Sequence, residues 1–197
     1  MTSTLCPDEA NVREFSQRWT KAGGMVWEAC GYDAIIKAVE QAWYQLAIPD
    51  PSVSVWPVIY WVNPELQHIE WSQILQQYGP VKAWEWGSRE DMRQVATTAV
   101  LGITGCAWAV AVTGSVALYA SETTGLWPSI LPPAHLVLVA RQRIVRTVAE
   151  GLRQMAGAPL PPLFKIVTGP SMTADIEGTL VIGVHGPGRV GAIVYDV

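Results

Sequence analysis

Residues 168–187 of the chain are Thr168-Gly-Pro-Ser-Met-Thr-Ala-Asp-Ile-Glu-Gly-Thr-Leu-Val-Ile-Gly-Val-His-Gly-Pro187. The glycines and prolines of this stretch require particular backbone angles, so it is not an ordinary core element. Between them lie hydroxyl, carboxyl and imidazole groups, which bind ligands or exchange protons. The apolar run 164–168 predicts a short buried strand. Because open α/β sheets bind ligands beyond the carboxyl ends of their strands, Gly169 begins a candidate site loop.

The candidate catalytic groups of this stretch are Asp175, Glu177 and His185. Asp175 and Glu177 are two positions apart, so they share a face only if the chain is extended there. A histidine titrates near neutral pH and can act as a proton acceptor. The structural alternative is that the aspartate accepts N–H groups of its own loop and the histidine binds a loop carbonyl. The sequence leaves both interpretations open.

Candidate ligand-binding groups come from two loops. In the first loop, Gly169, Ser171 and Thr173 offer hydroxyls and backbone N–H groups to an anion. In the second loop, Thr113-Gly114-Ser115, glycine permits close approach of a ligand. The alternatives are a capped turn and a hairpin turn. Both loops follow short apolar strands, so we expect them to converge on one concave surface with the histidine near its rim.

The same stretch resembles a known signature. Gly-Pro-Ser, Thr-Ala-Asp-Ile-Glu and a later His-Gly-Pro are similar to the C-terminal pattern of the LUD-domain family, in its LutC-like group of lactate-utilisation proteins. Two weaker resemblances lie upstream, in GITGCAWAVAVTGSVAL at 102–118 and in Leu131-Pro132 with HLVLVA at 135–140. The resemblance therefore covers 102–197, and the first half matches only in its rhythm of helices and strands.

The resemblance implies a single domain over 1–197 with a Rossmann-like α/β fold. Its sheet would be mainly parallel, flanked by helices and related to the sugar-phosphate isomerase and CoA-transferase-like folds. It also implies a subunit that oxidises L-lactate to pyruvate beside iron–sulfur partner proteins, and that binds a small anionic ligand or a partner.

Three positions depart from the family pattern. Val112 stands where the family usually has glutamate, Met172 where it has arginine, and Gly188 where a basic residue is expected. The first two changes remove an acid/base group and a strong anion donor. Two alternatives therefore stay open. The chain is a freestanding isomerase or CoA-transferase-like enzyme that uses the three candidate catalytic groups, or a scaffold or sensor that kept the fold and lost the site.

Composition excludes several classes of protein. Half of the 197 residues are hydrophobic, 15% are charged and the net charge is −4. The sequence therefore predicts one globular domain that does not bind nucleic acid. The three cysteines are far apart and form no Cys-x-x-Cys motif. We expect no metal and no redox cofactor in this chain, so any iron–sulfur centre belongs to a partner.

The amino-terminal residues show neither a basic region nor an apolar run, which predicts a cytoplasmic protein. The stretch 94–121 has no charged residue and is long enough to cross a bilayer. Ser88 and Asp91 form a capping box before it, and glycines interrupt its later part. We therefore interpret it as a helix followed by two buried strands and expect no membrane span.

The remaining elements follow from apolar periodicity and turn residues. Strand-then-helix alternation predicts βαβ units and a mainly parallel sheet in the first half, and a hairpin follows in the second. The expected helices are 11–21, 33–46, 64–78, 88–99 and 142–155. The expected strands are 25–29, 58–62, 81–86, 105–111, 115–120, 135–140, 164–168 and 192–196.

Overall fold

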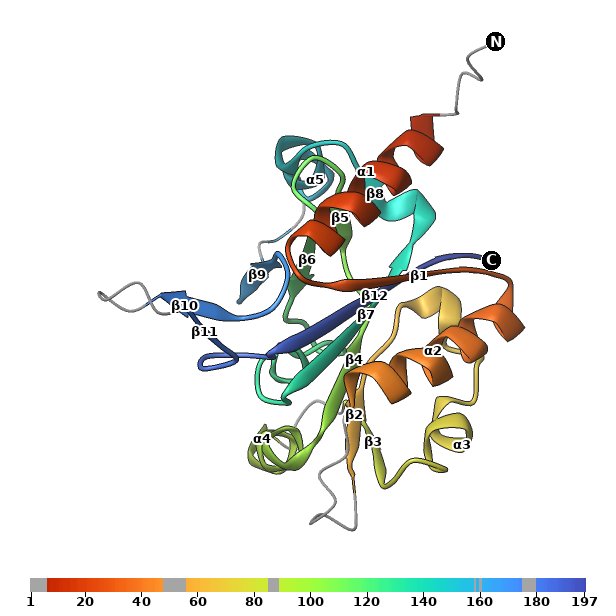
Figure 1. Ribbon diagram of the computed structural model, residues 1–197, viewed down its shortest axis with the longest axis vertical. Coiled ribbons are helices and arrows are strands. Elements are labelled where there is room, and N and C mark those ends of the chain that lie inside the picture. The colour runs from red at the N-terminus through yellow and green to blue at the C-terminus, as the bar shows by residue number, and fades with distance from the viewer. Residues whose placement is uncertain (1–6, 48–55, 85–88, 158, 160, 175–179) are drawn as a thin grey trace.

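The computed structural model describes residues 7–47, 56–84, 89–157, 159, 161–174 and 180–197. Its centre is a six-stranded, all-parallel sheet in the order β1-β12-β7-β4-β2-β3 (Figure 1). This arrangement confirms the predicted α/β class and parallel sheet. The strands are β1 (Met25–Cys30), β2 (Val58–Tyr60), β3 (Val81–Ala83), β4 (Leu101–Thr104), β7 (Ala134–Ala140) and β12 (Arg189–Asp196).

One face of this sheet is covered by α2 (Tyr32–Leu46) and α3 (Trp71–Leu75), which lie on the same side in Figure 1. Helix α2 turns a buried apolar stripe toward the sheet because its large residues recur at helical spacing, at Ile35, Val39, Trp43 and Leu46. A Cβ atom at Gly191 of β12 would lie 2.8 Å from the Leu46 side chain. Glycine at this position therefore lets the helix pack closely on the sheet.

The other face is covered by α1 (Pro7–Lys21) and by a second, four-stranded sheet in the order β8-β5-β6-β9. The predicted hairpin is confirmed, since β5 (Trp108–Val110) and β6 (Ser115–Tyr119) pair antiparallel. Strand β8 (Ile144–Val145) runs parallel to β5, and β9 (Phe164–Val167) runs antiparallel to β6. Helix α5 (Val148–Gln154) packs against β5 on the outside of this sheet.

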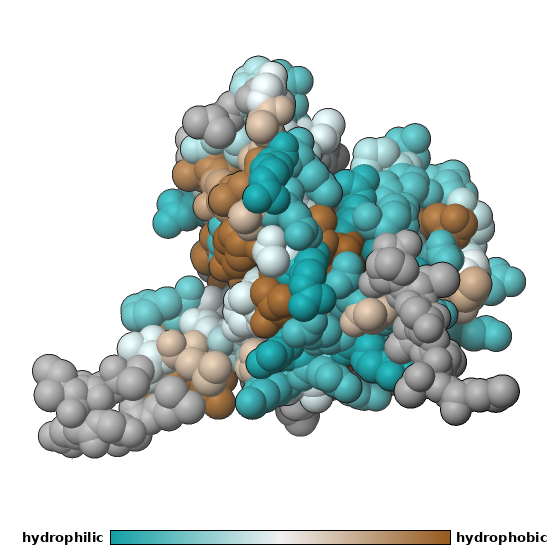
Figure 2. Space-filling model, turned by 90° about the horizontal axis from the view of Figure 1, so that it is seen from above, coloured by the Kyte–Doolittle hydropathy of each residue, from teal (hydrophilic) through white to brown (hydrophobic). Residues whose placement is uncertain are grey.

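A two-stranded antiparallel hairpin projects from the body of the molecule (Figures 1 and 2). It consists of β10 (Met172–Ala174) and β11 (Leu180–Ile182), and we call residues 172–174 and 180–184 the arm. Its side chains include four exposed apolar ones, those of Met172, Val181, Ile182 and Val184. Two strands without further partners are marginally stable in water, so the anchoring of the arm to the body matters for its order.

The stretch 94–121 corrects one prediction. After α4 (Arg89–Thr98) the chain forms three buried strands and not two, because β4 is separate from β5 and belongs to the large sheet. The turn 105–107 between them moves the chain from one sheet to the other. No described helix is both long and apolar enough to cross a bilayer. Ser88, the predicted cap, lies outside the described residues.

The predicted helix 142–155 is also wrong in its first half. The 3-10 helix η3 (Arg141–Arg143) and strand β8 come first, and α5 begins only after Thr147. The Thr147 hydroxyl accepts from the Glu150 N–H while the Glu150 carboxylate accepts from the Thr147 N–H. This reciprocal cap fixes the start of the helix. Leu152 on α5 is 49% exposed, so this position of the helix faces outward.

The strand predicted at 164–168 differs in burial and in partners. It is β9, an edge strand of the four-stranded sheet, and its Phe164 and Ile166 side chains are exposed. The Gly169 loop that follows therefore does not lie beyond the carboxyl ends of the parallel strands, which corrects the topological argument for the site. The apolar alternation of an edge strand and that of a buried strand are alike over four residues.

Candidate functional site

A cavity of about 220 Å³ lies at the amino ends of β7 and β12. Its wall is formed by β9, by the loops 168–171 and 185–187, and by the 3-10 helix η2 (Trp127–Ser129). The polar side chains lining it are those of Ser129, His135, Lys165, Thr168, Ser171 and His185. We call this cavity the Lys165 pocket. It lies at the end of the sheet opposite to the one predicted from topology.

Lys165 brings the positive charge to this pocket. Its Nζ atom donates a hydrogen bond to the Ser129 carbonyl at 2.9 Å. Burial lowers the pKa of Lys165 to about 8. No acidic side chain is among the described residues that line the pocket, and the described ion pairs do not include this lysine. The ammonium group is thus partly removed from water without a carboxylate partner in the described part of the chain.

His135 forms part of the pocket floor and is fully buried. Its Nε2 atom shares a hydrogen bond of 2.8 Å with the Thr104 hydroxyl, whereas its Nδ1 atom has no partner among the described residues. Burial, and then the charge of Lys165, lower the pKa of His135 to about 3, so the ring is neutral at physiological pH. A buried polar atom without a partner costs about 1–3 kcal/mol.

Three predicted site residues meet at this pocket, namely Gly169, Ser171 and His185. Gly169 has a φ of +73°, and a Cβ atom there would lie 2.5 Å from the Ala22 carbonyl oxygen, so only glycine suits this turn. The Ser171 N–H donates to the Pro187 carbonyl at 2.9 Å, and the Ser171 carbonyl accepts from the Gly183 N–H at 2.8 Å. These bonds join the two ends of the arm at the pocket rim. His185 is exposed on that rim.

The second predicted loop is a neighbour of the pocket but does not line it. The Ser115 hydroxyl donates to the Thr113 hydroxyl at 2.8 Å and lies 2.6 Å from the Thr168 hydroxyl, which joins the two loops. Ser115 is buried, and a Cβ atom at Gly114 would lie 2.4 Å from the Trp19 backbone nitrogen. Gly114 therefore allows helix α1 to pack closely on this turn.

The structure does not place the other predicted site residues at the pocket. Thr173 lies on β10 in the arm and is exposed. Asp175 and Glu177 lie outside the described residues. Within the described part of the chain, no group of three histidine, cysteine or acidic side chains is placed to hold a metal ion.

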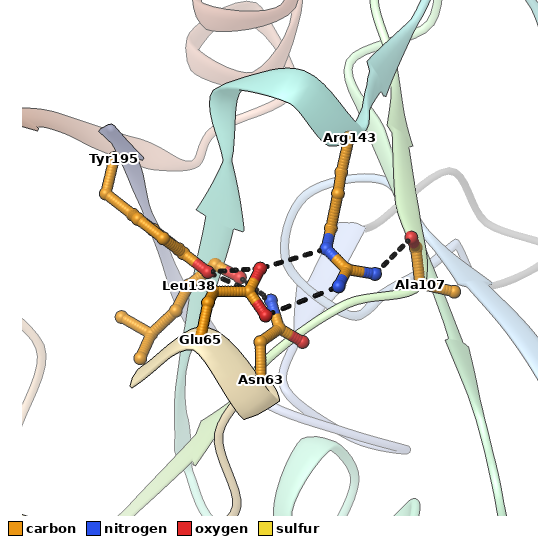
Figure 3. Close-up of polar contacts among 6 residues, drawn as sticks. All are labelled: Asn63, Glu65, Ala107, Leu138, Arg143 and Tyr195. Atoms are coloured by element: carbon orange, nitrogen blue, oxygen red, sulfur yellow. Dashed lines mark hydrogen bonds and ion pairs between the residues drawn. The ribbon is translucent and has the colours of Figure 1, made fainter. Parts of the chain in front are cut away.

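The carboxyl ends of the parallel strands carry a different group of polar residues, which the sequence did not reveal (Figure 3). Glu65 and Arg143 form a two-point ion pair, with Nε–Oε1 at 3.1 Å and Nη2–Oε2 at 3.3 Å. The Tyr195 hydroxyl donates to Glu65 Oε1 at 3.0 Å and accepts from Asn63 Nδ2 at 3.3 Å. Arg143 Nη1 also donates to the Ala107 carbonyl at 3.3 Å. Because these groups satisfy one another, we interpret them as a cross-link between strand ends.

The ionisation of Glu65 makes this cross-link dependent on pH. Burial by itself would raise the pKa of Glu65, but its hydrogen bonds from the backbone, Arg143 and Tyr195 outweigh burial and lower it below the ordinary value of 4.5. A carboxylate whose pKa is lowered by folding stabilises the fold above its unfolded pKa. That contribution is lost as the pH falls through the pKa of the folded state.

Glu65→Gln should therefore destabilise the protein by about 1–2 kcal/mol at pH 7, a value that allows for partial exposure of the ion pair. The difference from wild type should shrink as the pH falls below 4.5, the ordinary carboxyl value. Urea unfolding between pH 3.5 and 7 measures both effects. Glu90→Gln is the matched control, because its ion pair with Arg93 is largely exposed and should contribute less than about 0.5 kcal/mol. A pH-independent difference for Glu65→Gln would contradict the assigned ion pair.

Comparison with known proteins identifies relatives of this chain. The chain is 36% identical over 120 residues to lactate utilization protein C 1 of Bacillus mycoides, which covers 58% of this chain and 51% of that protein. It is 31% identical over 144 residues to lactate utilization protein C of Halalkalibacterium halodurans, which covers 71% of this chain and 62% of that protein. The matches thus span about half to three fifths of the length of these curated relatives.

The fold has a counterpart among solved structures. The crystal structure of a DUF162 family protein from Deinococcus radiodurans superposes with a TM-score of 0.63 over 98% of this chain and 100% of that one, at 20% identity. A sequence model of the LUD domain matches residues 5–195, nearly the whole chain. The chain therefore belongs to the LUD domain family, as its C-terminal signature predicted.

Proposed function

We propose that this protein is a LutC-like subunit that takes part in the oxidation of L-lactate to pyruvate together with iron–sulfur partner proteins. The family match and the names of the relatives support this role. The observation that carries it furthest is the position of the family signature. Its segments form both the rim of the Lys165 pocket and the exposed apolar arm, which are surfaces suited to a ligand and to a partner.

In this proposal the chain is a single cytoplasmic domain that binds a small anion and a partner, and the partner transfers the electrons. The fold would be a relative of the sugar-phosphate isomerase and CoA-transferase-like folds. The alternative of a freestanding CoA-transferase-like enzyme receives less support. A cavity of about 220 Å³ is smaller than the roughly 300–1,000 Å³ typical of pockets for drug-sized ligands.

Growth on L-lactate tests the proposed role. Deletion of the gene should abolish or strongly slow growth on L-lactate as sole carbon source and leave growth on pyruvate unchanged, because only the oxidation step is removed. The wild-type gene should restore growth. A variant with Met172 and Ile182 both changed to serine should restore it poorly if the arm binds the partner. Undiminished growth of the deletion strain on L-lactate would contradict the role.

A further inference from the structure

We infer that the Lys165 pocket is a binding site for a small monocarboxylate, with Lys165 as its counter-charge and the His135 ring as a second hydrogen-bond donor. This inference rests on the proposed function for the 2-hydroxy or 2-oxo class of the ligand, and thus for lactate and pyruvate as probes. Three features indicate the site itself, namely the charge of Lys165, the unpaired Nδ1 atom of His135 and the volume of the cavity.

The charge of the pocket favours a single negative charge on the ligand. Lys165 is the cationic side chain in the described wall, and His135 beside it is neutral. His185 is the third titratable group that faces the cavity, and it lies on the exposed rim. An ammonium group taken out of water is stabilised by an opposite charge within contact distance. A monocarboxylate supplies that charge, whereas a multiply charged anion would bring charge that the described wall does not neutralise.

One ring nitrogen of His135, a residue that lines the cavity, has no hydrogen-bond partner among the described residues. The Thr104 hydroxyl can donate to Nε2 of His135, which leaves the ring proton on Nδ1. Nδ1 is the atom without a partner, in a side chain that is fully buried and lines the cavity. Lys165 uses one of its three N–H groups on the Ser129 carbonyl, so two donors remain for a ligand. A carboxylate between Lys165 and His135 would satisfy both residues.

Size and the rim further restrict the ligand. The cavity of about 220 Å³ is smaller than the roughly 300–1,000 Å³ typical of pockets for drug-sized ligands, so it favours a smaller molecule. Ser171 also lines the cavity, so its hydroxyl is available to a polar group of the ligand beside the carboxylate. These features fit a short monocarboxylate, and the proposed function narrows the class to 2-hydroxy and 2-oxo acids.

Calorimetric titration of the purified full chain tests this inference. The probes are sodium L-lactate and sodium pyruvate, with lactamide as the uncharged analogue and chloride and phosphate as other anions, all at constant ionic strength. We expect lactate or pyruvate to bind at least tenfold more tightly than lactamide, chloride or phosphate. Lys165→Met should weaken that binding at least tenfold. Lys37→Met, at an exposed position on α2, is the matched control and should leave it unchanged.

A spectroscopic measurement tests the His135 contact without a variant that risks misfolding. Ring ¹⁵N resonances of His135 should show the proton on Nδ1 and should shift when the carboxylate is added. Binding should also become weaker above about pH 8, because the ligand needs the protonated lysine and the pKa of Lys165 is about 8 in the empty pocket. The chain should accordingly take up a proton on binding near pH 8.5, which titrations in two buffers of different ionisation enthalpy measure.

Each contrary result is decisive. Equal binding of lactamide, equal binding of chloride or phosphate, or an unchanged affinity in Lys165→Met would overturn the inference. So would the absence of any binding by the wild-type chain. Failure of the proposed function is a separate result, since it would appear as a deletion strain that still grows on L-lactate, whatever the chain binds in the calorimeter.

Discussion

Trp19→Ala should lower the free energy of unfolding by about 3–5 kcal/mol, as expected when a fully buried tryptophan is truncated. The ring of Trp19 stacks on Phe15 with a centroid distance of 5.8 Å, and its Nε1 atom donates to the Met25 carbonyl at 3.0 Å. It also fills the space above Gly24, where a Cβ atom would lie 2.2 Å from Nε1. The variant would lose the packing and leave the Met25 carbonyl without this donor.

Thermal and urea unfolding followed by far-UV circular dichroism measure this effect. For a domain of this size, the expected loss corresponds to a fall in melting temperature of roughly 6–20 °C. Tyr44→Ala is the control, because that aromatic side chain is 74% exposed and should contribute less than about 1 kcal/mol. Similar losses in the two variants would mean that α1 does not pack as described.

Gly102→Ala should destabilise the protein by about 3 kcal/mol or more, although it adds a single methyl group. Gly102 lies in β4, inside the parallel sheet, and a Cβ atom there would lie 1.7 Å from the Pro128 carbonyl oxygen. Both groups belong to backbone elements, so neither can move aside as a flexible side chain would. Overpacking of this kind typically costs about 1–3 kcal/mol, and a rigid backbone contact lies at or above the upper end.

The yield of soluble protein and the urea midpoint measure the consequence of this substitution. Gly188→Ala is the matched control, because a Cβ atom there meets its nearest neighbour at 3.4 Å, an ordinary contact distance. The control should stay within about 1 kcal/mol of wild type. A Gly102→Ala protein as stable as the control would show that η2 does not lie against β4.

The sequence predicted the parts of the fold that follow from local pattern. The apolar stripe of α2 and the strand β1 come from periodicity alone, and both are confirmed. The strand β4 was not separated from β5 because the difference between them is tertiary. The turn 105–107 separates β4, which belongs to the large sheet, from β5, which belongs to the small one. Residues that pair 30 or more positions apart along the chain leave no local signal of this choice.

The candidate site was predictable where its residues lie together in sequence. Gly169, Ser171 and His185 belong to one signature, and the structure places all three around one cavity. Lys165 and His135 were not predicted as site residues, because each lies in an apolar run that indicates only a strand. A lysine among apolar residues on a predicted strand was the available signal, since such a charge requires a reason to be there.

The polar cross-link was beyond prediction from the sequence. Glu65 contacts Arg143, 78 positions away, and Tyr195, 130 positions away. Its members lie near the ends of separate elements, and their meeting depends on the strand order of the sheet. The topological rule pointed to the carboxyl ends of the strands, where this cross-link lies, whereas the Gly169 loop and the candidate ligand site lie at the amino ends.

Ser171 belongs both to the wall of the Lys165 pocket and to the base of the arm. The Ser171 N–H donates to the Pro187 carbonyl and the Ser171 carbonyl accepts from the Gly183 N–H, so one residue joins the base of the arm to the wall of the cavity. A partner that binds the arm and displaces Ser171 would therefore alter the affinity of the pocket for its ligand. By thermodynamic reciprocity, the ligand would change the affinity of the chain for the partner by the same factor. In that case the family signature would couple the two binding sites, and the stability of the assembled complex would depend on whether the small molecule is bound.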